Sequence, residues 1–190
     1  AQGVAFSAKH FNIEATIVMP ESTPLTKVLG VKEFGVNVIL HGSNYDEAYA
    51  YAVTYAKEKN KNFVHPFTDD EVMSGQGTVA LEMMEEINDL DAIIVPVGGG
   101  GLISGIGEVT KALSPKTKVI AVSAQGAPAM KNSFEAKKVL DTLSVRTIAD
   151  GIAVRDTSPV TLEHILKNVD AFESVCEDEI ASAILFLLEK

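Results

Sequence analysis

The chain has 190 residues, of which 46% are hydrophobic, so length and composition predict one domain or two small ones with a substantial core. The net charge of −10 disfavours nucleic acid and anionic membranes as partners, because both attract basic surfaces. The single cysteine, Cys176, excludes an intrachain disulfide framework, and without a signal-peptide pattern or a bilayer-length apolar run we expect a cytoplasmic protein.

The first third of the chain alternates short apolar runs with helical patterns, which is typical of an α/β domain with a parallel sheet. The expected strands are 16–19, 36–40 and 63–64. The expected helices are 1–12, 25–34 and 46–59. Ser22 or Thr23 is expected to cap the helix over 25–34, and Gly35 to end it. We expect a polar loop over residues 65–73 to hold the boundary between domain 1–68 and domain 69–190.

The remainder of the chain repeats the alternation and predicts a second parallel-sheet domain. The expected strands are 93–97, 118–122 and 171–175. The expected helices are 79–87, 102–113, 129–134 and 180–190. The fold class is therefore α/β, with two doubly wound domains. Because the sequence opens inside a helix without an initiator Met and stops on an amphipathic helix, we expect a fragment truncated at both ends.

The stretch over residues 93–107 predicts an anion site. An apolar run with the composition of a strand buried on both faces is followed by four glycines and then by a helix. The glycines are Gly98, Gly99, Gly100 and Gly101, and Leu102 follows them. Glycine lets backbone amides approach a ligand closely, and a helix N-terminus favours negative charge. A tight turn is the alternative, but four consecutive glycines exceed what a turn needs.

The sequence around the glycines narrows the class of phosphate ligand. A nucleoside-triphosphate loop requires Lys and Ser or Thr after its last glycine, whereas Leu102 and Ile103 stand here. A dinucleotide fingerprint would need glycine at Ser104 and an acidic residue at the end of the next strand, where Ser123 stands. A phosphate monoester such as pyridoxal phosphate or a sugar phosphate remains.

Other candidate residues carry weaker indications. The histidines lie far apart without metal-ligand spacing: His10, His41, His65 and His164. Ser104 lacks a nucleophile-elbow context and either donates to phosphate or packs. Cys176 beside an acidic run is not expected to be a nucleophile. Asp150, next to Gly151 in an apolar loop, needs partners and either lies near the ligand or caps a turn. No lysine stands in a sequence context that would desolvate its amine, and Lys27 is the least polar in its surroundings.

Several segments together resemble the fold-type II pyridoxal-phosphate enzymes. The branch most similar is that of the threonine ammonia-lyases, with serine racemase and serine dehydratase as neighbours. The similarity covers essentially the whole chain. It is carried by 20–35 with Pro24 and Lys27, His65-Pro66-Phe67, Gly75-Gln76-Gly77-Thr78, 98–102, 147–154 and 175–184.

The resemblance implies pyridoxal 5′-phosphate as cofactor and deamination of L-threonine to 2-oxobutanoate and ammonia, in amino-acid metabolism that includes isoleucine biosynthesis. The phosphate would be held by Gly98, Gly99, Gly100, Gly101 and Leu102, with Gly151 close to the cofactor. Residues 1–68 would form an incomplete small, substrate-closing domain, and residues 69–190 part of the large cofactor-binding domain. Family members generally form homo-oligomers, dimers or tetramers.

The chain departs from the family pattern in three places. In the family the Schiff-base lysine lies in a segment that would precede Ala1, so we expect no catalytic residue here and no activity from the isolated chain. The residue that contacts the pyridine nitrogen follows the final helix. At the divalent-cation site of the racemase branch stand Ser123, Ala127 and Ala129, so no metal is expected. Serine racemase or serine dehydratase, and a non-catalytic phosphate-binding module, remain as alternatives.

Overall fold

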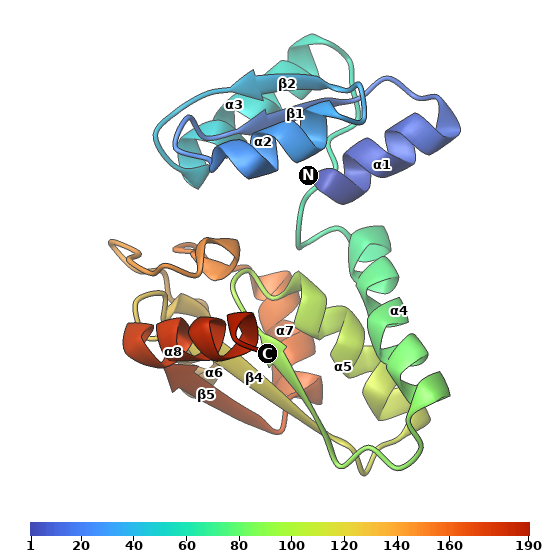
Figure 1. Cartoon of the computed structure of the whole chain (residues 1–190), viewed down its shortest axis with the longest axis vertical. Helices are drawn as coiled ribbons and strands as arrows, with labels where there is room; N and C mark the ends of the chain where they lie inside the picture. The colour runs from blue at the N-terminus through green and yellow to red at the C-terminus, as the bar shows by residue number, and fades with distance from the viewer. The chain divides into compact units, whose positions relative to one another are not determined.

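The structure is a computed structural model that describes residues 1–190 (Figure 1). The chain forms two compact units, residues 1–64 and residues 65–190. Each unit contains one sheet whose strands are all parallel. The predicted α/β class with two parallel-sheet domains is therefore confirmed, whereas the assignment of small and large domains divided after residue 68 stays a prediction. None of the helices has the length and apolar character needed to cross a bilayer.

The first unit is a two-stranded sheet with three helices. In chain order its elements are α1 (Gln2–Phe11), β1 (Thr16–Met19), α2 (Leu25–Lys32), β2 (Asn37–Leu40) and α3 (Tyr45–Glu58). The strands pair in register from Thr16 opposite Asn37 to Met19 opposite Leu40. The small core is formed by Ala5, Ile17, Met19, Val28 and Val31. At the start of α3, Asn44 accepts the amide of Glu47, and acidic residues fill the first turn as predicted.

Two expectations for this unit are wrong. The side chains of Ser22 and Thr23 do not cap α2; Pro24 stands at the cap with φ −51°, a value that its ring imposes, and Ser22 instead donates to the carbonyl of Ser43. Residues 63–64 form no strand, because neither sheet offers them a neighbouring strand to pair with. Gly35, at φ +78°, adopts the left-handed conformation expected beyond the end of α2.

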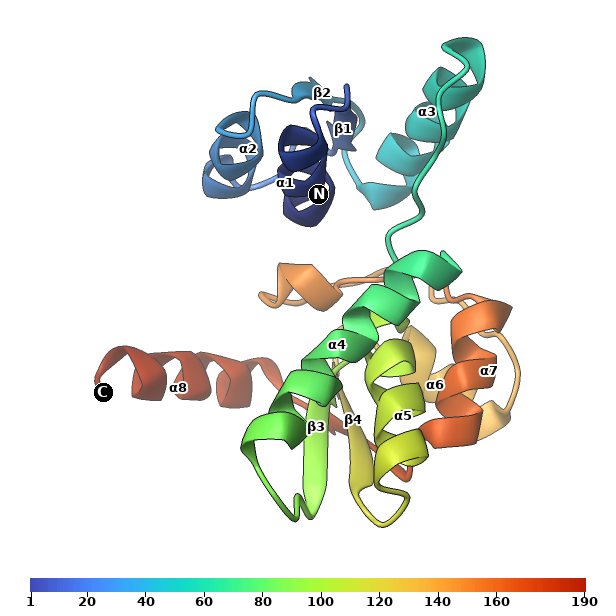
Figure 2. The ribbon, with the colours of Figure 1, turned by 90° about the vertical axis from the view of Figure 1, so that its right-hand side faces the viewer.

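The second unit is a three-stranded parallel sheet in the order β3-β4-β5. Its strands are β3 (Ala92–Pro96), β4 (Lys118–Ala124) and β5 (Ala171–Val175). Its helices are α4 (Asp70–Glu86), α5 (Gly101–Leu113), α6 (Ala129–Ala136), the short 3₁₀ helix η1 (Asp150–Ile152), α7 (Pro159–Asn168) and α8 (Glu177–Leu188). Figure 2 shows α5, α6 and α7 on one side of the sheet and α8 on the other. The main hydrophobic core lies between the sheet and α5.

Helix α4 begins earlier than expected. The sequence predicted a loop up to residue 73 and a helix from residue 79, but the observed helix starts at Asp70. The carboxylate of Asp69 accepts the amides of Glu71 and Val72 and begins the helix at Asp70. The segment 75–78 therefore lies inside a helix. Glycine weakens a helix interior, and tertiary packing outweighs that weakness here, because Gly77 is buried where α4 crosses α5.

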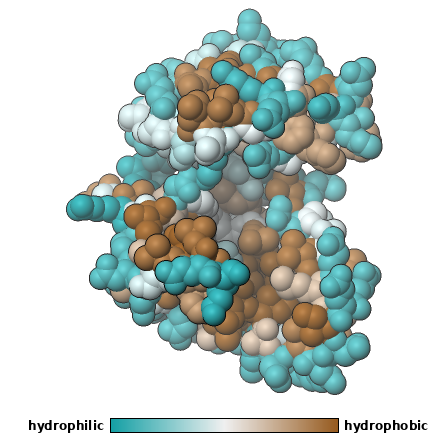
Figure 3. Space-filling model, in the orientation of Figure 1, coloured by the Kyte–Doolittle hydropathy of each residue, from teal (hydrophilic) through white to brown (hydrophobic).

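Strand β3 is also less buried than expected. Ile93 and Val95 are in the core, but Ile94 on the opposite face is 67% exposed. The reason is that β3 lies at the sheet edge and α8, the helix on that side, buries none of its own residues. Apolar side chains gather over α8 in Figure 3, and its exposed members are Ile184, Leu185, Phe186, Leu187 and Leu188. The prediction that β3 is buried on both faces is wrong.

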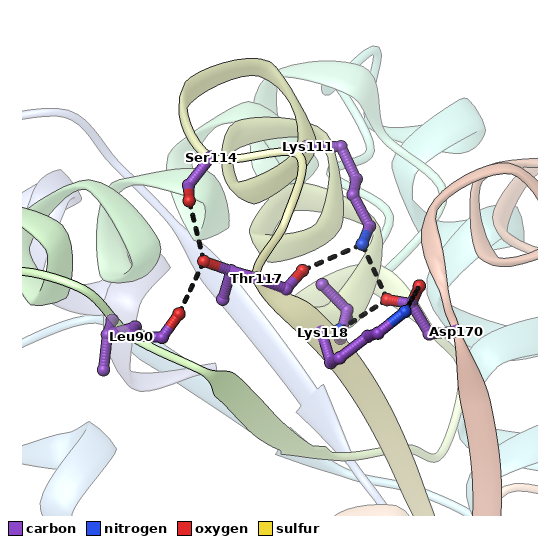
Figure 4. A network of polar contacts seen from close by, with 7 residues as sticks. Leu90, Lys111, Ser114, Thr117, Lys118 and Asp170 are labelled. Carbon is purple, nitrogen blue, oxygen red and sulfur yellow. Dashed lines mark hydrogen bonds and ion pairs between the residues drawn. The ribbon is translucent and has the colours of Figure 1, made fainter.

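A polar network ties the amino ends of the strands together (Figure 4). The Lys111 ammonium donates to the Thr117 carbonyl at 2.8 Å and to the Asp170 carboxylate at 2.6 Å. The Asp170 carboxylate also accepts a hydrogen bond from the Val119 amide at 2.8 Å and forms an ion pair with the Lys118 ammonium at 3.4 Å. The hydrogen bond from Lys111, together with the Val119 amide, holds the pKa of Asp170 at about 2 despite the opposing effect of burial.

We expect Asp170→Asn to lower the free energy of unfolding by about 1–2 kcal/mol at neutral pH, because charge-assisted hydrogen bonds to Lys111 and Val119 are weakened. A lowered carboxyl pKa stabilises the fold above the unfolded value of 3.8, and this stabilisation is lost as pH falls toward 2. Urea unfolding at a series of pH values should therefore show the wild-type advantage shrinking below about pH 4. The exposed pair of Asp89 with Lys116 provides the control, and Asp89→Asn should leave the stability almost unchanged, because solvent screens this ion pair. An equal loss from both variants, or a loss independent of pH, would contradict the assignment.

Candidate functional site

The glycine loop, defined as residues 98–101, connects the carboxyl end of β3 to the first turn of α5. Gly99, Gly100 and Gly101 are buried, and Gly100 stands at the helix N-cap with φ +92°. That left-handed conformation explains why this position in particular requires glycine.

The backbone amides of the loop have no partners within the chain. Before the loop, the Val97 amide donates to the Val122 carbonyl at 2.8 Å, and after it the Ser104 amide donates to the Gly100 carbonyl at 2.9 Å. Between these two positions, no amide from Gly98 to Ile103 donates to a protein acceptor in the structure. Buried backbone amides are nearly always paired, so this consecutive unpaired row is available to an external acceptor. The N-terminal end of α5 adds a favourable field for an anion. These residues fit the phosphate group of a cofactor.

Neighbouring segments occupy the space where side chains on the four glycines would lie. A Cβ on Gly98 would come 2.8 Å from Cα of Ile152, and one on Gly99 would come 2.6 Å from the Phe67 ring. A Cβ on Gly101 would come 2.8 Å from Cα of Phe67. The loop is therefore enclosed by the 65–68 turn and by the end of η1 with the residues that follow it, and glycine serves protein packing as well as ligand approach.

Helix α7, which the sequence analysis did not predict, forms a third wall of the loop. A Cβ on Gly100 would come 2.9 Å from Cβ of Thr161 and 2.9 Å from Cδ1 of Ile165, both in α7. A signal was present: Ser158 caps the helix, Pro159 occupies its first turn, and apolar residues recur at helical spacing. Phe67 had no comparable local signal, because its contact with the glycine loop is distant in sequence, whereas the 147–154 segment that contains Ile152 was expected near the ligand.

The structure decides between the two alternatives for Ser104 and shows the surroundings of Asp150 and Gly151. The Ser104 hydroxyl donates to the Gly100 carbonyl at 2.8 Å and is 1% exposed, so the packing alternative is correct. Asp150 is exposed in η1 rather than enclosed by apolar groups, and the choice between a role near the ligand and a role in capping a turn stays a prediction. The 147–154 segment contacts the glycine loop through Ile152 and Val154. Gly151 itself is exposed with no atom near its Cβ position, and its role beside the cofactor stays a prediction.

The polar residues on the outer side of α5 form an interhelical clamp. The Glu108 carboxylate contacts Nδ1 of His164 at 2.9 Å and the Lys167 ammonium at 3.0 Å, which ties α5 to α7. Burial raises the pKa of Glu108, but the hydrogen bonds from His164 and Lys167 outweigh that effect and hold the pKa at about 2. His164 is thus engaged in helix packing, in agreement with the structural role expected for it.

No metal centre is formed by the residues of the chain. Residues 1–190 contain no group of three His, Cys, Asp or Glu side chains arranged to hold an ion. The positions that the resemblance relates to cation ligands are buried and small, with Ser123 and Ala129 at 0% exposure and Ala127 at 3%. The Ser123 hydroxyl makes no hydrogen bond in the structure.

The whole chain is similar to known proteins. The sequence profile of the family described as pyridoxal-phosphate dependent enzyme matches residues 1–190. The chain is 46% identical over 190 residues to the L-threonine ammonia-lyase of Thermotoga maritima, covering 100% of this chain and 47% of that protein. It is 46% identical over 186 residues to the mitochondrial threonine dehydratase of Schizosaccharomyces pombe, covering 97% of this chain and 31% of that one.

Solved structures give the same relationship. The processed form of threonine deaminase isoform 2 from Solanum lycopersicum superimposes with a TM-score of 0.92 at 35% identity, covering 99% of this chain and 52% of that one. Maize serine racemase superimposes with a TM-score of 0.91 at 34% identity, covering 97% and 56%. The chain spans about half the length of the first of these relatives.

Proposed function

This chain belongs to the family of pyridoxal-phosphate dependent enzymes, and from that premise we propose that the whole protein converts L-threonine into 2-oxobutanoate and ammonia. The identity of 46% to an L-threonine ammonia-lyase supports this substrate. A serine-directed activity, racemase or dehydratase, is the second candidate, and the structural match to maize serine racemase at 34% identity favours it less.

The row of unpaired amides from Gly98 to Ile103 is the observation that carries the proposal. Gly98, Gly99, Gly100, Gly101 and Leu102 would hold the cofactor phosphate through main-chain N–H groups at the N-terminus of α5. Pyridoxal phosphate, when bound, supplies the electron sink that stabilises a carbanion on the amino acid.

The chain's own contribution is to bind and orient. The field of α5 favours the phosphate dianion, and the close packing of the neighbouring segments fixes the loop in one conformation. Several lysines of the second unit are already paired with carboxylates: Lys111, Lys116, Lys118 and Lys167. We infer that the lysine linked to the cofactor comes from a part of the whole protein outside these 190 residues, and that the isolated chain binds phosphate without deaminating threonine.

The cofactor site can be tested on the isolated chain by amide spectra of nitrogen-15-labelled protein. Pyridoxal 5′-phosphate should shift the amide signals of residues 98–103, whereas pyridoxal, which lacks the phosphate, should leave them in place at equal concentration. The comparison separates phosphate binding from aldehyde reactions with surface lysines, because both compounds carry the aldehyde. Equal shifts from the two compounds, or none from either, would exclude the glycine loop as the phosphate site.

The substrate can be tested on the whole protein. We expect formation of 2-oxobutanoate from L-threonine with a kcat/KM above that for L-serine, and no product from the 190-residue chain alone. A higher kcat/KM for serine, or D-serine formation, would transfer the proposal to the serine-directed alternative. Sedimentation of the whole protein tests the dimer or tetramer that we also propose.

A further inference from the structure

The 65–68 turn is closed by one imidazole. The backbone amides of Phe67 and Thr68 donate to Nδ1 of His65 at 3.3 and 3.1 Å. A ring nitrogen that accepts hydrogen bonds carries no proton, so the proton of the neutral ring is on Nε2. A protonated imidazole has two donors and no acceptor. Only the neutral form of His65 can therefore close this turn.

The surroundings of His65 favour that neutral form. Burial lowers the pKa of His65, against the opposing effect of the Asp69 carboxylate. The same Asp69 begins α4 by accepting the amides of Glu71 and Val72. The turn is thus held by a side-chain acceptor at its start and is continuous with a capped helix at its end.

Phe67 transmits the position of the turn to the glycine loop. Its ring meets the His65 ring edge-on, with centroids 4.6 Å apart and planes at 88°. The same ring fills the space beside Gly99, and its Cα lies against Gly101. The amide of Phe67 is one of the two that His65 accepts, so the imidazole holds both the backbone and the ring of this residue.

We propose that His65 is a positioning residue for the anion site. By accepting the two amides it holds Phe67 against Gly99 and Gly101, and so keeps the amides of the glycine loop aligned on a phosphate. The inference rests on the proposed function in one respect, that the glycine loop is the phosphate site. A preorganised site binds more tightly, because fewer conformations are lost on binding.

The test uses sulfate, a dianion that does not titrate near neutral pH, with the amide signals of residues 98–103 as the readout. His65→Leu should weaken sulfate binding by about tenfold, because both turn amides lose their acceptor. His65→Asn should bind within about twofold of wild type, because an asparagine carbonyl accepts amides two and three residues ahead in the same way. Urea unfolding confirms that each variant is folded.

The wild-type protein supplies a measurement that does not depend on any variant. Its imidazole nitrogen–proton spectrum should identify Nδ1 of His65 as the unprotonated nitrogen, and a proton on Nδ1 would overturn the inference. Wild-type affinity in His65→Leu, or equal losses in the Leu and Asn variants, would overturn it as well while leaving the cofactor site intact. Absence of anion binding at the glycine amides of the wild type would overturn the cofactor site, and the inference with it.

Discussion

Replacing Gly105 by alanine is expected to lower the free energy of unfolding by about 2–4 kcal/mol, because the new methyl group has no space between α4 and α5. A Cβ on Gly105 would lie 2.1 Å from the Met73 carbonyl oxygen and 2.6 Å from the Gly77 nitrogen. Both are backbone atoms, so no side-chain rotation can relieve the overlap, and the two helices must separate. The helix-propensity gain of alanine over glycine, about 1 kcal/mol, offsets only part of the cost.

Gly75→Ala is the matched control, since Gly75 lies in α4 and has no atom within 4 Å of its Cβ position. This variant should be more stable than wild type by about 0.5–1 kcal/mol. Urea unfolding followed by circular dichroism measures both variants. If Gly105→Ala were as stable as Gly75→Ala, the close crossing of α4 and α5 would not exist in solution.

This crossing shows where sequence reasoning reached its limit. Gly77 and Gly105 each weaken a helix by local propensity, and the helix after the predicted 65–73 loop was expected to begin at residue 79, nine residues beyond the observed start of α4 at Asp70. The two glycines lie opposite each other only after α4 and α5 have packed, so no window of local sequence contains both. Tertiary packing decided the boundary, while the Asp69 cap was a local signal that could have been used.

The predictions that were correct depend on local physics. Strands β1, β4 and β5 coincide with short, mostly apolar runs, and their length and composition identify them as strands. The glycine loop was recognisable because unpaired amides and a helix start follow from the order strand, glycines, helix. The exposure of Ile94 was not predictable, because it depends on which helices cover a sheet face and not on the strand itself.

In the candidate site, too, some features were predictable from local sequence and others were not. The backbone of residues 98–101 was predicted as an anion site from sequence, whereas the residues that shape it come from three distant segments. Phe67, Ile152 and Thr161 supply packing contacts, through backbone as well as side-chain atoms, that carry no chemical signature. Their role is evident only in the structure, where they occupy the space that side chains on the four glycines would need. The presence of a binding loop can thus be predicted from its own residues, whereas its rigidity depends on residues distant in sequence that only the structure identifies.

Gly100→Ala should abolish most of the affinity for pyridoxal 5′-phosphate, with a loss of more than about tenfold, because it strains the loop in two ways. At φ +92° an L-residue is disfavoured whatever space surrounds it. The added methyl group would also come 2.9 Å from Thr161 and from Ile165 of α7, displacing the loop from its wall. Loss of the left-handed conformation at the N-cap should turn the amides of the first α5 turn away from the proposed phosphate site.

Fluorescence titration with the cofactor and the amide signals of residues 98–103 measure the effect together. Gly75→Ala again serves as the control, since it lies outside the loop and should bind as wild type does. The double variant Gly100→Ala with Thr161→Ser should regain little, because removing one methyl group relieves neither the positive φ nor the contact with Ile165. Wild-type affinity in Gly100→Ala would show that the glycine loop does not need its observed conformation to bind phosphate, and the backbone-amide site would have to be abandoned.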